Sequence, residues 1–238
     1  MKIVVTSDWH LDALTDGVPR WEEVEAAVDY SVDVAIQQRA GLYIFGGDLC
    51  DPDGWNSTRA IAKAISVALK LDNAGIPSIW VAGNHDVVED GLGTTVLTPL
   101  VSAEVAYHVF EQPGEIIFTG GKQDLHIVGL PFTPSSHAYD PVATVRDMSK
   151  PRAGEQTIVL GHLNLEGISA GSETTEMARG RDVFWPIDAL KKKWPQAVLV
   201  GGHYHHAQQF KGVHIVGSLA RLRHDEEEHS PSLLILEV

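Results

Sequence analysis

The chain has 238 residues, of which 44% are hydrophobic, so it is long enough for one domain with a substantial buried core. Its formal net charge of −14 argues against a protein that grips nucleic acid through its overall charge, but not against nucleic acid as a substrate, because bound cations can reverse the potential locally. The single cysteine, Cys50, excludes an intramolecular disulfide framework and fits a reducing compartment.

Strands and helices alternate in the first third of the chain. Short apolar, β-branched runs at residues 3–6, 42–45 and 78–82 predict buried strands. Between them, residues 21–39 and 57–74 carry hydrophobic side chains at helical spacing. In the second of these helices, the face expected to be buried carries Ile61, Ile65, Ala68 and Leu69. This order predicts parallel strands joined by helical crossovers.

The rest of the chain is rich in short β-type segments. Strands are expected near residues 105–110, 115–119, 124–129, 157–160, 197–200, 206–210, 213–217 and 232–237. Together with the first third, they predict a mixed α/β fold in which two packed sheets carry helices on their outer faces. We find no repeat, linker, signal peptide or run of membrane-spanning length, and we therefore expect a cytoplasmic protein without a membrane partner.

Five polar clusters follow apolar runs along the chain. They are Asp8-Trp9-His10, Gly46-Gly47-Asp48, Gly83-Asn84-His85-Asp86, Gly161-His162 and Gly202-His203-Tyr204-His205. Each cluster comes directly after a predicted strand, and the carboxyl ends of strands are where open α/β sheets build their sites. Their side chains are therefore expected to converge, although they lie far apart in the sequence.

The side chains of these clusters suit a pair of divalent cations. Two cations about 3.5–4 Å apart can activate water and neutralise a phosphoryl group, and a carboxylate is needed to bridge them. We assign the bridge to Asp48. The ligands of one ion are then Asp8, His10 and His205, and those of the other are Asn84, His162 and His203. Imidazole, carboxylate and amide ligands predict manganese, with iron or zinc as alternatives, rather than calcium.

Two further residues are assigned to catalysis and three to substrate binding. His85 is expected to stabilise the phosphoryl oxygens or to protonate the leaving oxygen, with Asp86 orienting its imidazole. The candidates for substrate contacts are His137, Arg179 and Arg181.

The five clusters resemble the motifs of the calcineurin-like metallophosphoesterases. The segments SDWH, GGD, GNHD, GH and GHYH match in order, and they span nearly the whole chain. This resemblance implies a four-layer α-β-β-α sandwich of two mixed β-sheets flanked by helices, with a dinuclear site at the strand ends. It also implies the seven metal ligands named above, a catalytic His85 and hydrolysis by metal-activated water.

Within this family the chain is most similar to DNA repair nucleases of the SbcD type. The similarity lies in TSDWHL, the GNHD segment, Leu165-Glu166-Gly167, Gly171-Ser172-Glu173 and Val216-Gly217-Ser218. Since the sequence ends at Val238, we expect a single metallophosphoesterase domain over residues 1–238 without a capping domain. The expected substrate is a phosphodiester, DNA in the leading interpretation. An ATPase partner subunit and a homo-oligomer stay open as partners.

Three other functions stay open. They are a phosphomonoesterase, a phosphodiesterase of the cyclic-nucleotide type and a non-catalytic module on the same fold. Phosphoprotein phosphatases of the family carry an arginine directly after the second motif, where this chain reads Leu49-Cys50-Asp51-Pro52. The missing arginine favours a diester over the more highly charged monoester. All motif residues are present, and this favours an enzyme over a module.

Overall fold

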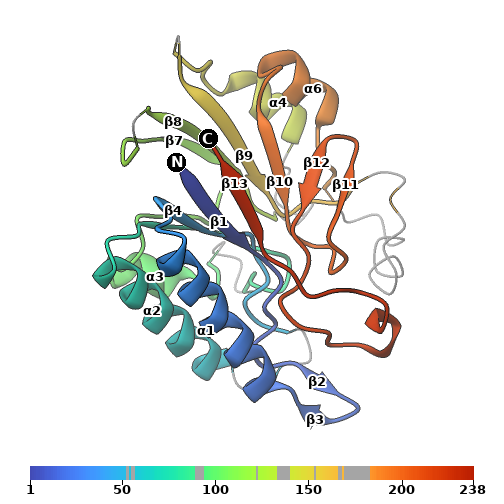
Figure 1. Cartoon of the computed structure of the whole chain (residues 1–238). Coiled ribbons are helices and arrows are strands. Elements are labelled where there is room, and N and C mark those ends of the chain that lie inside the picture. The colour runs from blue at the N-terminus through green and yellow to red at the C-terminus, as the bar shows by residue number, and fades with distance from the viewer. Residues whose placement is uncertain are drawn as a thin grey trace.

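Two β-sheets face one another, and helices cover both of their outer surfaces (Figure 1). The structure, a computed structural model, describes residues 1–51, 54, 57–88, 94–121, 123–132, 140–152, 154–165, 168 and 183–238. In this part of the chain, no helix is both long and apolar enough to cross a membrane. The arrangement is the predicted α-β-β-α sandwich.

The first sheet has five strands. Their order is β13 (Leu234–Glu237), β1 (Lys2–Thr6), β4 (Leu42–Phe45), β5 (Ser78–Val81) and β6 (His108–Phe110). Strands β1, β4, β5 and β6 run parallel, as the alternation of strands and helices predicts, while β13 pairs antiparallel with β1. The carboxyl ends of the parallel strands therefore lie along one edge of the sheet.

The second sheet has six strands. Their order is β11 (Gln208–Phe210), β12 (Val213–Ile215), β10 (Val198–Gly201), β9 (Gln156–Gly161), β8 (Leu125–Leu130) and β7 (Gly114–Phe118). The central strands β12, β10, β9 and β8 are parallel, and the outer strands β11 and β7 are antiparallel to their neighbours. Both sheets are thus mixed. A small hairpin of β2 (Leu14–Thr15) and β3 (Val18–Pro19) stands apart from them.

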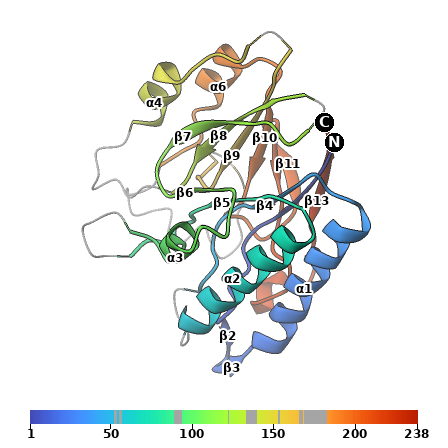
Figure 2. The same ribbon diagram turned by 90° about the vertical axis from the view of Figure 1, so that its left-hand side faces the viewer.

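Helices form the two outer layers (Figure 2). The first sheet is covered by α1 (Trp21–Gln37), α2 (Ser57–Asn73) and α3 (Thr98–Ser102), and the second by α4 (Pro141–Asp147) and α6 (Ile187–Lys193). The two long helices agree with the sequence prediction. The three short ones were not predicted, since five or seven residues make too few turns for a readable hydrophobic period. A 3₁₀ turn, η3 (His224–Glu226), lies in the last loop.

Alternation along the strands explains the layers. On β1, Ile3 and Val5 point between the two sheets, whereas Val4 points toward the helices of the first sheet. Strand β4 does the same with Ile44 inside and Phe45 under the helices. Because successive side chains of a strand point to opposite faces, each sheet needs apolar residues on both faces to be covered on both sides. The continuous apolar runs of these strands meet that need.

The buried face of α2 differs from the prediction. It consists of Ala60, Ala64, Val67, Ala68 and Leu71. Leu69 is 44% exposed, and Ile61 and Ile65 lie at the edge of the core. The prediction gave weight to the largest apolar side chains, but small alanines bring the helix close to the sheet while the bulkier isoleucines flank the contact.

Candidate metal centre

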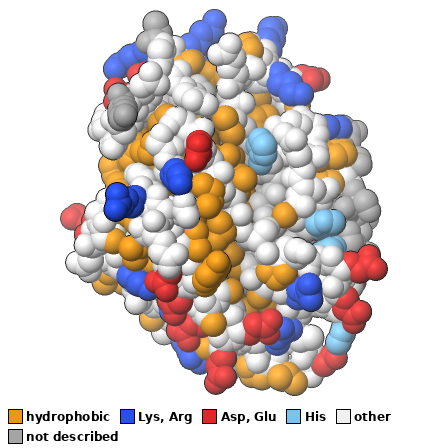
Figure 3. Space-filling model, viewed as in Figure 1, with side chains coloured by type: hydrophobic (Ala, Val, Ile, Leu, Met, Phe, Trp, Pro, Cys, Tyr) orange, Lys and Arg blue, Asp and Glu red, His pale blue; other side chains and the backbone are white. Residues whose placement is uncertain are grey.

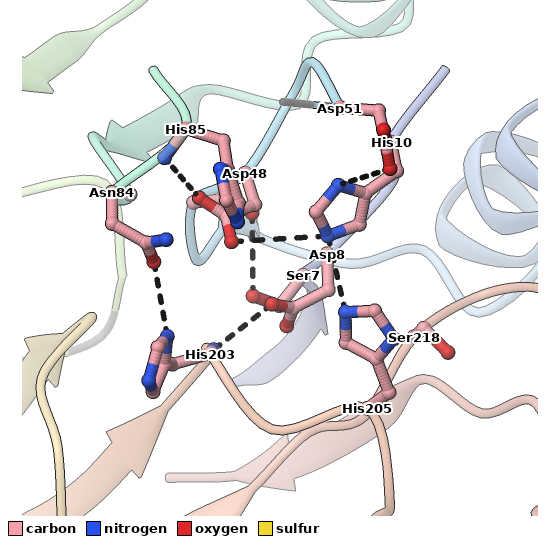
Figure 4. Close-up of polar contacts among 12 residues, drawn as sticks. Ser7, Asp8, His10, Asp48, Asp51, Asn84, His85, His203, His205 and Ser218 are labelled. Atoms are coloured by element: carbon pink, nitrogen blue, oxygen red, sulfur yellow. Dashed lines mark hydrogen bonds and ion pairs between the residues drawn. The ribbon is translucent and has the colours of Figure 1, made fainter. Parts of the chain in front are cut away.

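The five motif clusters meet where the carboxyl ends of the strands of both sheets come together (Figure 4). Asp8 follows β1, Asp48 follows β4 and Asn84 follows β5 in the first sheet. His162 follows β9 and His203 follows β10 in the second. Figure 4 shows Asp8 and Asp48 at the middle, His10 and His205 on one side, and Asn84 and His203 on the other.

The first cluster consists of Asp8, His10 and His205, all buried, with ligand atoms that lie within 4.8 Å of one another. The Nε2 atoms of His10 and His205 are 3.1 Å apart. Asp8 Oδ1 accepts a hydrogen bond of 3.0 Å from the backbone N–H of His203, while its Oδ2 is buried without a hydrogen-bond partner. An unpartnered buried carboxylate oxygen is costly unless something positive lies against it.

The second cluster consists of Asp48, His162 and His203, again all buried, and Asn84 lies beside it. Asn84 Oδ1 is 3.1 Å from His162 Nε2 and 3.0 Å from His203 Nδ1. His162 Nε2 is also 3.1 Å from Asp48 Oδ2. Oxygen and nitrogen atoms that carry lone pairs therefore converge on one place.

Asp48, a member of the second cluster, lies between the imidazoles of the two clusters. Its Oδ2 is 3.1 Å from His162 Nε2 in the second cluster and 3.8 Å from His10 Nε2 in the first. Its Oδ1 accepts a hydrogen bond of 3.0 Å from the backbone N–H of His85. Asp48 Oδ2 is therefore within 3.8 Å of an imidazole nitrogen from each cluster.

Hydrogen bonds to the remaining ring nitrogens define how each imidazole faces the centre. His162 donates from Nδ1 to the Gly46 carbonyl over 2.8 Å, and His203 donates from Nε2 to Asn164 Oδ1 over 2.8 Å. Each ring therefore turns its other nitrogen, with a free lone pair when the ring is neutral, toward the centre.

In the first cluster, carboxylates lie next to the ring nitrogens that face away from the centre. His205 donates from Nδ1 to Glu226 Oε1 over 2.6 Å. His10 Nδ1 lies 3.5 Å from Asp51 Oδ2, an ion-pair distance without a hydrogen bond. The two clusters thus differ in the charge of the groups behind their imidazoles.

Four of these residues have left-handed backbone conformations. The φ angles are 53° for Asp8, 44° for His10, 60° for Asp48 and 84° for His203. Such conformations cost about 1–3 kcal/mol each outside glycine and cluster at functional sites. Trp9, between the first two, packs against Phe45 and Trp80 in the core, with ring centroids 4.6 and 5.5 Å away. The core therefore holds this turn in place.

Two motif glycines leave room for the side chains of the centre. A Cβ on Gly83 would overlap Asp48 Oδ1, and a Cβ on Gly47 would overlap the His162 ring. Gly47 also has a φ of 111°, which favours glycine. The glycines of the second and third motifs are thus needed for close approach to the centre.

Charges within the centre shift the pKa values of its groups in opposite directions. Burial raises the pKa of Asp8. Burial would also raise the pKa of Asp48, but the neighbouring imidazoles, His162 first, outweigh it and hold that pKa well below its usual range. Burial acts to lower the pKa of His162, yet Asp48 raises it to about 10. Without a cation, a proton on His162 balances Asp48.

The imidazoles of His10 and His203 stay neutral. Burial, followed by the nearby charge of His205, holds the pKa of His10 well below its usual range. Burial and the charge of His162 lower the pKa of His203 to about 3. Neutral imidazoles are the form that binds metal.

The residues fit a pair of divalent cations. Two ligand atoms about 2.1 Å from one ion, at angles between about 90° and 110°, lie about 3.0–3.4 Å apart. The contacts at Asn84 and between His10 and His205 fall in this range at 3.0 and 3.1 Å. The unpartnered Asp8 Oδ2 supplies a further oxygen, and the buried groups are those that bind transition metals. The two clusters therefore indicate a dinuclear metal site.

His85 lies at the mouth of the centre. It is only half-buried, unlike the ligand histidines, and its ring is 5.5 Å from that of His10. It comes from the loop after β5 and faces Asp48 (Figure 4). Its partial exposure leaves the ring accessible beside the metal clusters.

The structure corrects the role predicted for Asp86. Its Oδ2 accepts hydrogen bonds from the backbone N–H groups of Asp48 and Gly83, and its Oδ1 accepts one from Leu49, all at 2.8–2.9 Å. Burial, together with the charge of Asp48, raises its pKa to about 6. Asp86 fastens the loop after β5 to the Asp48 loop and is directed at these amides rather than at the His85 ring.

Some functional candidates were missed and others lie outside the described residues. Glu226 and Asn164, which hold His205 and His203, were not predicted. Glu226 lies in a run of four acidic residues, and the sequence offers no signal that singles out one member of it. The proposed substrate contacts His137, Arg179 and Arg181 fall outside the part of the chain that the structure describes.

Solved structures with a similar fold include two proteins of low sequence identity. A dimetal phosphatase from Danio rerio has a TM-score of 0.55 and 11% identity, with 99% of this chain and 91% of that chain covered. The protein TT1561 of Thermus thermophilus has a TM-score of 0.51 and 13% identity, with 91% and 89% covered. These likenesses show a shared architecture.

A family model is more specific than these likenesses. The model of the calcineurin-like phosphoesterases matches residues 1–207. This range includes every motif cluster that builds the centre, from Asp8 to His205. The match extends over most of the 238 residues. The chain therefore belongs to the calcineurin-like phosphoesterase family, which indicates a hydrolytic enzyme.

Proposed function

We propose that the protein is a dinuclear-metal-dependent phosphodiesterase, and that it acts on DNA as a nuclease of the SbcD type. The observation that carries the metal-dependent activity is the place of Asp48 Oδ2 between two buried clusters, 3.1 Å from His162 and 3.8 Å from His10. Manganese is the proposed metal, because the imidazole, carboxylate and amide ligands suit it.

Each group of the centre has a role in this proposal. The bound cations would activate water and neutralise charge on the phosphoryl group. Asp8, His10 and His205 would hold one of them, and Asn84, His162 and His203 the other, with Asp48 spanning both. His85, half-buried at the mouth, would donate a proton to the leaving oxygen or a hydrogen bond to the phosphoryl group. Burial of the imidazoles and packing of the turn at Trp9 against the core would hold the ligand side chains in fixed positions.

The acidic surroundings of the second motif support a diester substrate. Where phosphoprotein phosphatases of the family carry an arginine, this chain has Leu49, Cys50 and Asp51. The Asp51 carboxylate lies 3.5 Å from His10 Nδ1 and so adds negative charge beside the first cluster. That charge would repel a monoester dianion more strongly than a singly charged diester.

A phosphomonoesterase is the second candidate, and Arg223 is the observation in its favour. The charge of Arg223 acts on the buried His10 imidazole and helps to lower its pKa. A cation on this side of the centre could take the place of the absent arginine. The similar Danio rerio protein is described as a dimetal phosphatase. In this case, Arg223→Gln should reduce cleavage of monoesters more than cleavage of diesters.

DNA as the substrate is supported by the motifs shared with SbcD-type nucleases. Acidic side chains gather along the lower rim of the face in Figure 3, while lysine and arginine gather along its upper rim. Lys191, Lys192 and Lys193 form the last turn of α6, which precedes β10 in the chain, whereas the centre follows the carboxyl end of that strand. We propose that an ATPase subunit supplies the missing basic surface. The single cysteine supports a reducing, cytoplasmic location.

A panel of phosphoesters in the presence of Mn²⁺ tests the proposal. It compares single- and double-stranded DNA, RNA, bis(p-nitrophenyl) phosphate and p-nitrophenyl phosphate, each with wild-type protein and with His85→Asn. We expect cleavage of the diesters, with DNA preferred, and cleavage by the variant that is slower by about 10²–10⁴-fold. A strong preference for p-nitrophenyl phosphate would establish the monoesterase instead. Inactivity on every ester with every metal would refute both.

A further inference from the structure

Glu226 is a buried carboxylate within an exposed acidic run. Its side chain lies in the turn η3 and the residue is 3% exposed, while its neighbours Asp225, Glu227 and Glu228 are exposed. It lies beyond residue 207, where the match to the family model ends. A buried carboxylate needs partners that offset its desolvation. Glu226 has partners on both oxygens.

One oxygen of Glu226 is held by its own loop. Oε2 accepts hydrogen bonds from the backbone N–H groups of Leu222, at 2.7 Å, and Arg223, at 3.4 Å. Leu222 is buried in the core under the helices of the first sheet. The carboxylate is therefore fixed by the loop and the core, independently of the centre.

The other oxygen of Glu226 orients a residue of the first cluster. Oε1 accepts the hydrogen bond from His205 Nδ1 at 2.6 Å, which leaves the lone pair on His205 Nε2. That atom lies 3.1 Å from His10 Nε2. A carboxylate behind a histidine ligand fixes its tautomer and ring orientation and makes the ligand more basic.

The second cluster has no such carboxylate behind its imidazoles among the described contacts. His162 is held by the Gly46 carbonyl and His203 by the Asn164 amide oxygen, both neutral acceptors. We propose that Glu226 is a positioning residue of the first cluster, which makes binding of a divalent cation by Asp8, His10 and His205 depend on it. The inference rests on the dinuclear site of the proposed function.

Metal binding by Glu226→Gln tests the inference. Glutamine has the same shape, but its NH₂ must face either His205 Nδ1–H or the backbone N–H of Leu222, so that one of the two contacts is lost. In calorimetric titrations of metal-free protein with Mn²⁺, we expect two ions for the wild type. In the variant, the dissociation constant of one ion should rise about 10–100-fold and the other should stay unchanged. With Co²⁺, the absorption bands of one site should change.

Disabling each cluster in turn shows which ion is affected. In a His203→Ala background, which impairs the second cluster, Glu226→Gln should weaken the remaining ion. In a His10→Ala background, which impairs the first, it should have no effect on the ion that remains. This comparison separates positioning of His205 from a general loss of structure.

Glu115→Gln is the matched control. Glu115 Oε2 holds a second buried histidine, His126, through a contact of 3.0 Å between strands β7 and β8. Breaking this pair should lower the melting temperature but leave both Mn²⁺ dissociation constants unchanged. If Glu226→Gln does not fold, Glu226→Asp, which keeps the charge but retracts it by one methylene, should show the same selective weakening.

Three results with the variants would overturn the inference. They are wild-type affinity for both ions in the Glu226 variants, equal weakening of both ions, and a weakening that persists in the His10→Ala background. Failure of the proposed function looks different. A wild type that binds two ions but cleaves no phosphoester would refute the activity and leave the role of Glu226 standing. A wild type that binds no metal would overturn the inference as well.

Discussion

His85 differs from the ligand histidines in that its ring is half-buried at the mouth of the centre and belongs to neither metal cluster. We expect His85→Asn to lower kcat by about 10²–10⁴-fold, the usual contribution of a general acid or base. Its content of bound metal should stay near that of the wild type, because the variant removes no ligand. Kinetics and elemental analysis of the same preparation measure both. Loss of metal in this variant would refute the assignment.

His162 couples metal binding to pH. Asp48 raises the pKa of this buried imidazole to about 10, so that its ring carries a proton at pH 7 in the metal-free protein. A cation that binds to Nε2 must displace this proton. Apparent metal affinity should therefore rise with pH and level off above about 10, where the metal-free imidazole is already deprotonated.

Proton release upon metal binding gives a direct measure of this coupling. Calorimetric titrations with Mn²⁺ at pH 7, in two buffers of different ionisation enthalpy, should show release of about one proton or more. In His162→Asn, which has no ring to deprotonate, the released number should fall. Equal heats in both buffers for the wild type would contradict the pKa assigned to His162.

At the scale of elements, helix α2 offers a matched pair of leucines. Leu71 is fully buried against the first sheet, whereas Leu69 is 44% exposed. Leu71→Ala should lower the free energy of unfolding by about 2–5 kcal/mol, because it leaves a cavity. Leu69→Ala should change it by about 0.5 kcal/mol or less. Urea titrations of the metal-free proteins measure both, and equal effects would show that the helix is rotated about its axis.

The long elements could be predicted because their patterns are local. The strands β1, β4 and β5 are apolar runs that end in polar clusters, and the parallel order follows from the helices between them. The short helices α3 and α4 escaped prediction, since one or two turns give no measurable period. On α2, the buried face was misassigned because it consists largely of alanines, whereas the prediction favoured the bulkier apolar residues.

Only those residues of the centre that come directly after a predicted strand could be found from the sequence. Asp8, Asp48 and His162 sit in motifs whose spacing is visible in the sequence, and the structure brings them together. The contact between His205 and Glu226 joins residues 21 positions apart through a loop without a pattern. The hydrogen bonds of Asp86 depend on backbone amides, which the sequence does not distinguish. Such contacts can be identified only in the three-dimensional structure.

At the scale of the whole molecule, bound metal should contribute a large part of the free energy of unfolding. Without cations, the protein keeps an unpartnered Asp8 oxygen and left-handed turns at Asp8 and Asp48. A cation at 100 times its dissociation constant adds about 2.7 kcal/mol per site to the free energy of unfolding. Calorimetry should therefore show a higher melting temperature with Mn²⁺ than with a chelator. In Asp48→Asn the difference should shrink, and equal temperatures for the wild type would contradict a metal centre.

The pairing of β1 with β13 has a consequence for protein engineering. The first and last residues lie side by side, with the N–H of Val238 donating to the carbonyl of Met1 over 2.9 Å (Figure 1). A short linker could join them into a circularly permuted chain whose new ends open in an exposed loop. Fusion partners attached at either end would emerge together, at the start of the strand whose far end carries Asp8. A bulky tag could therefore be carried there without covering the mouth of the centre.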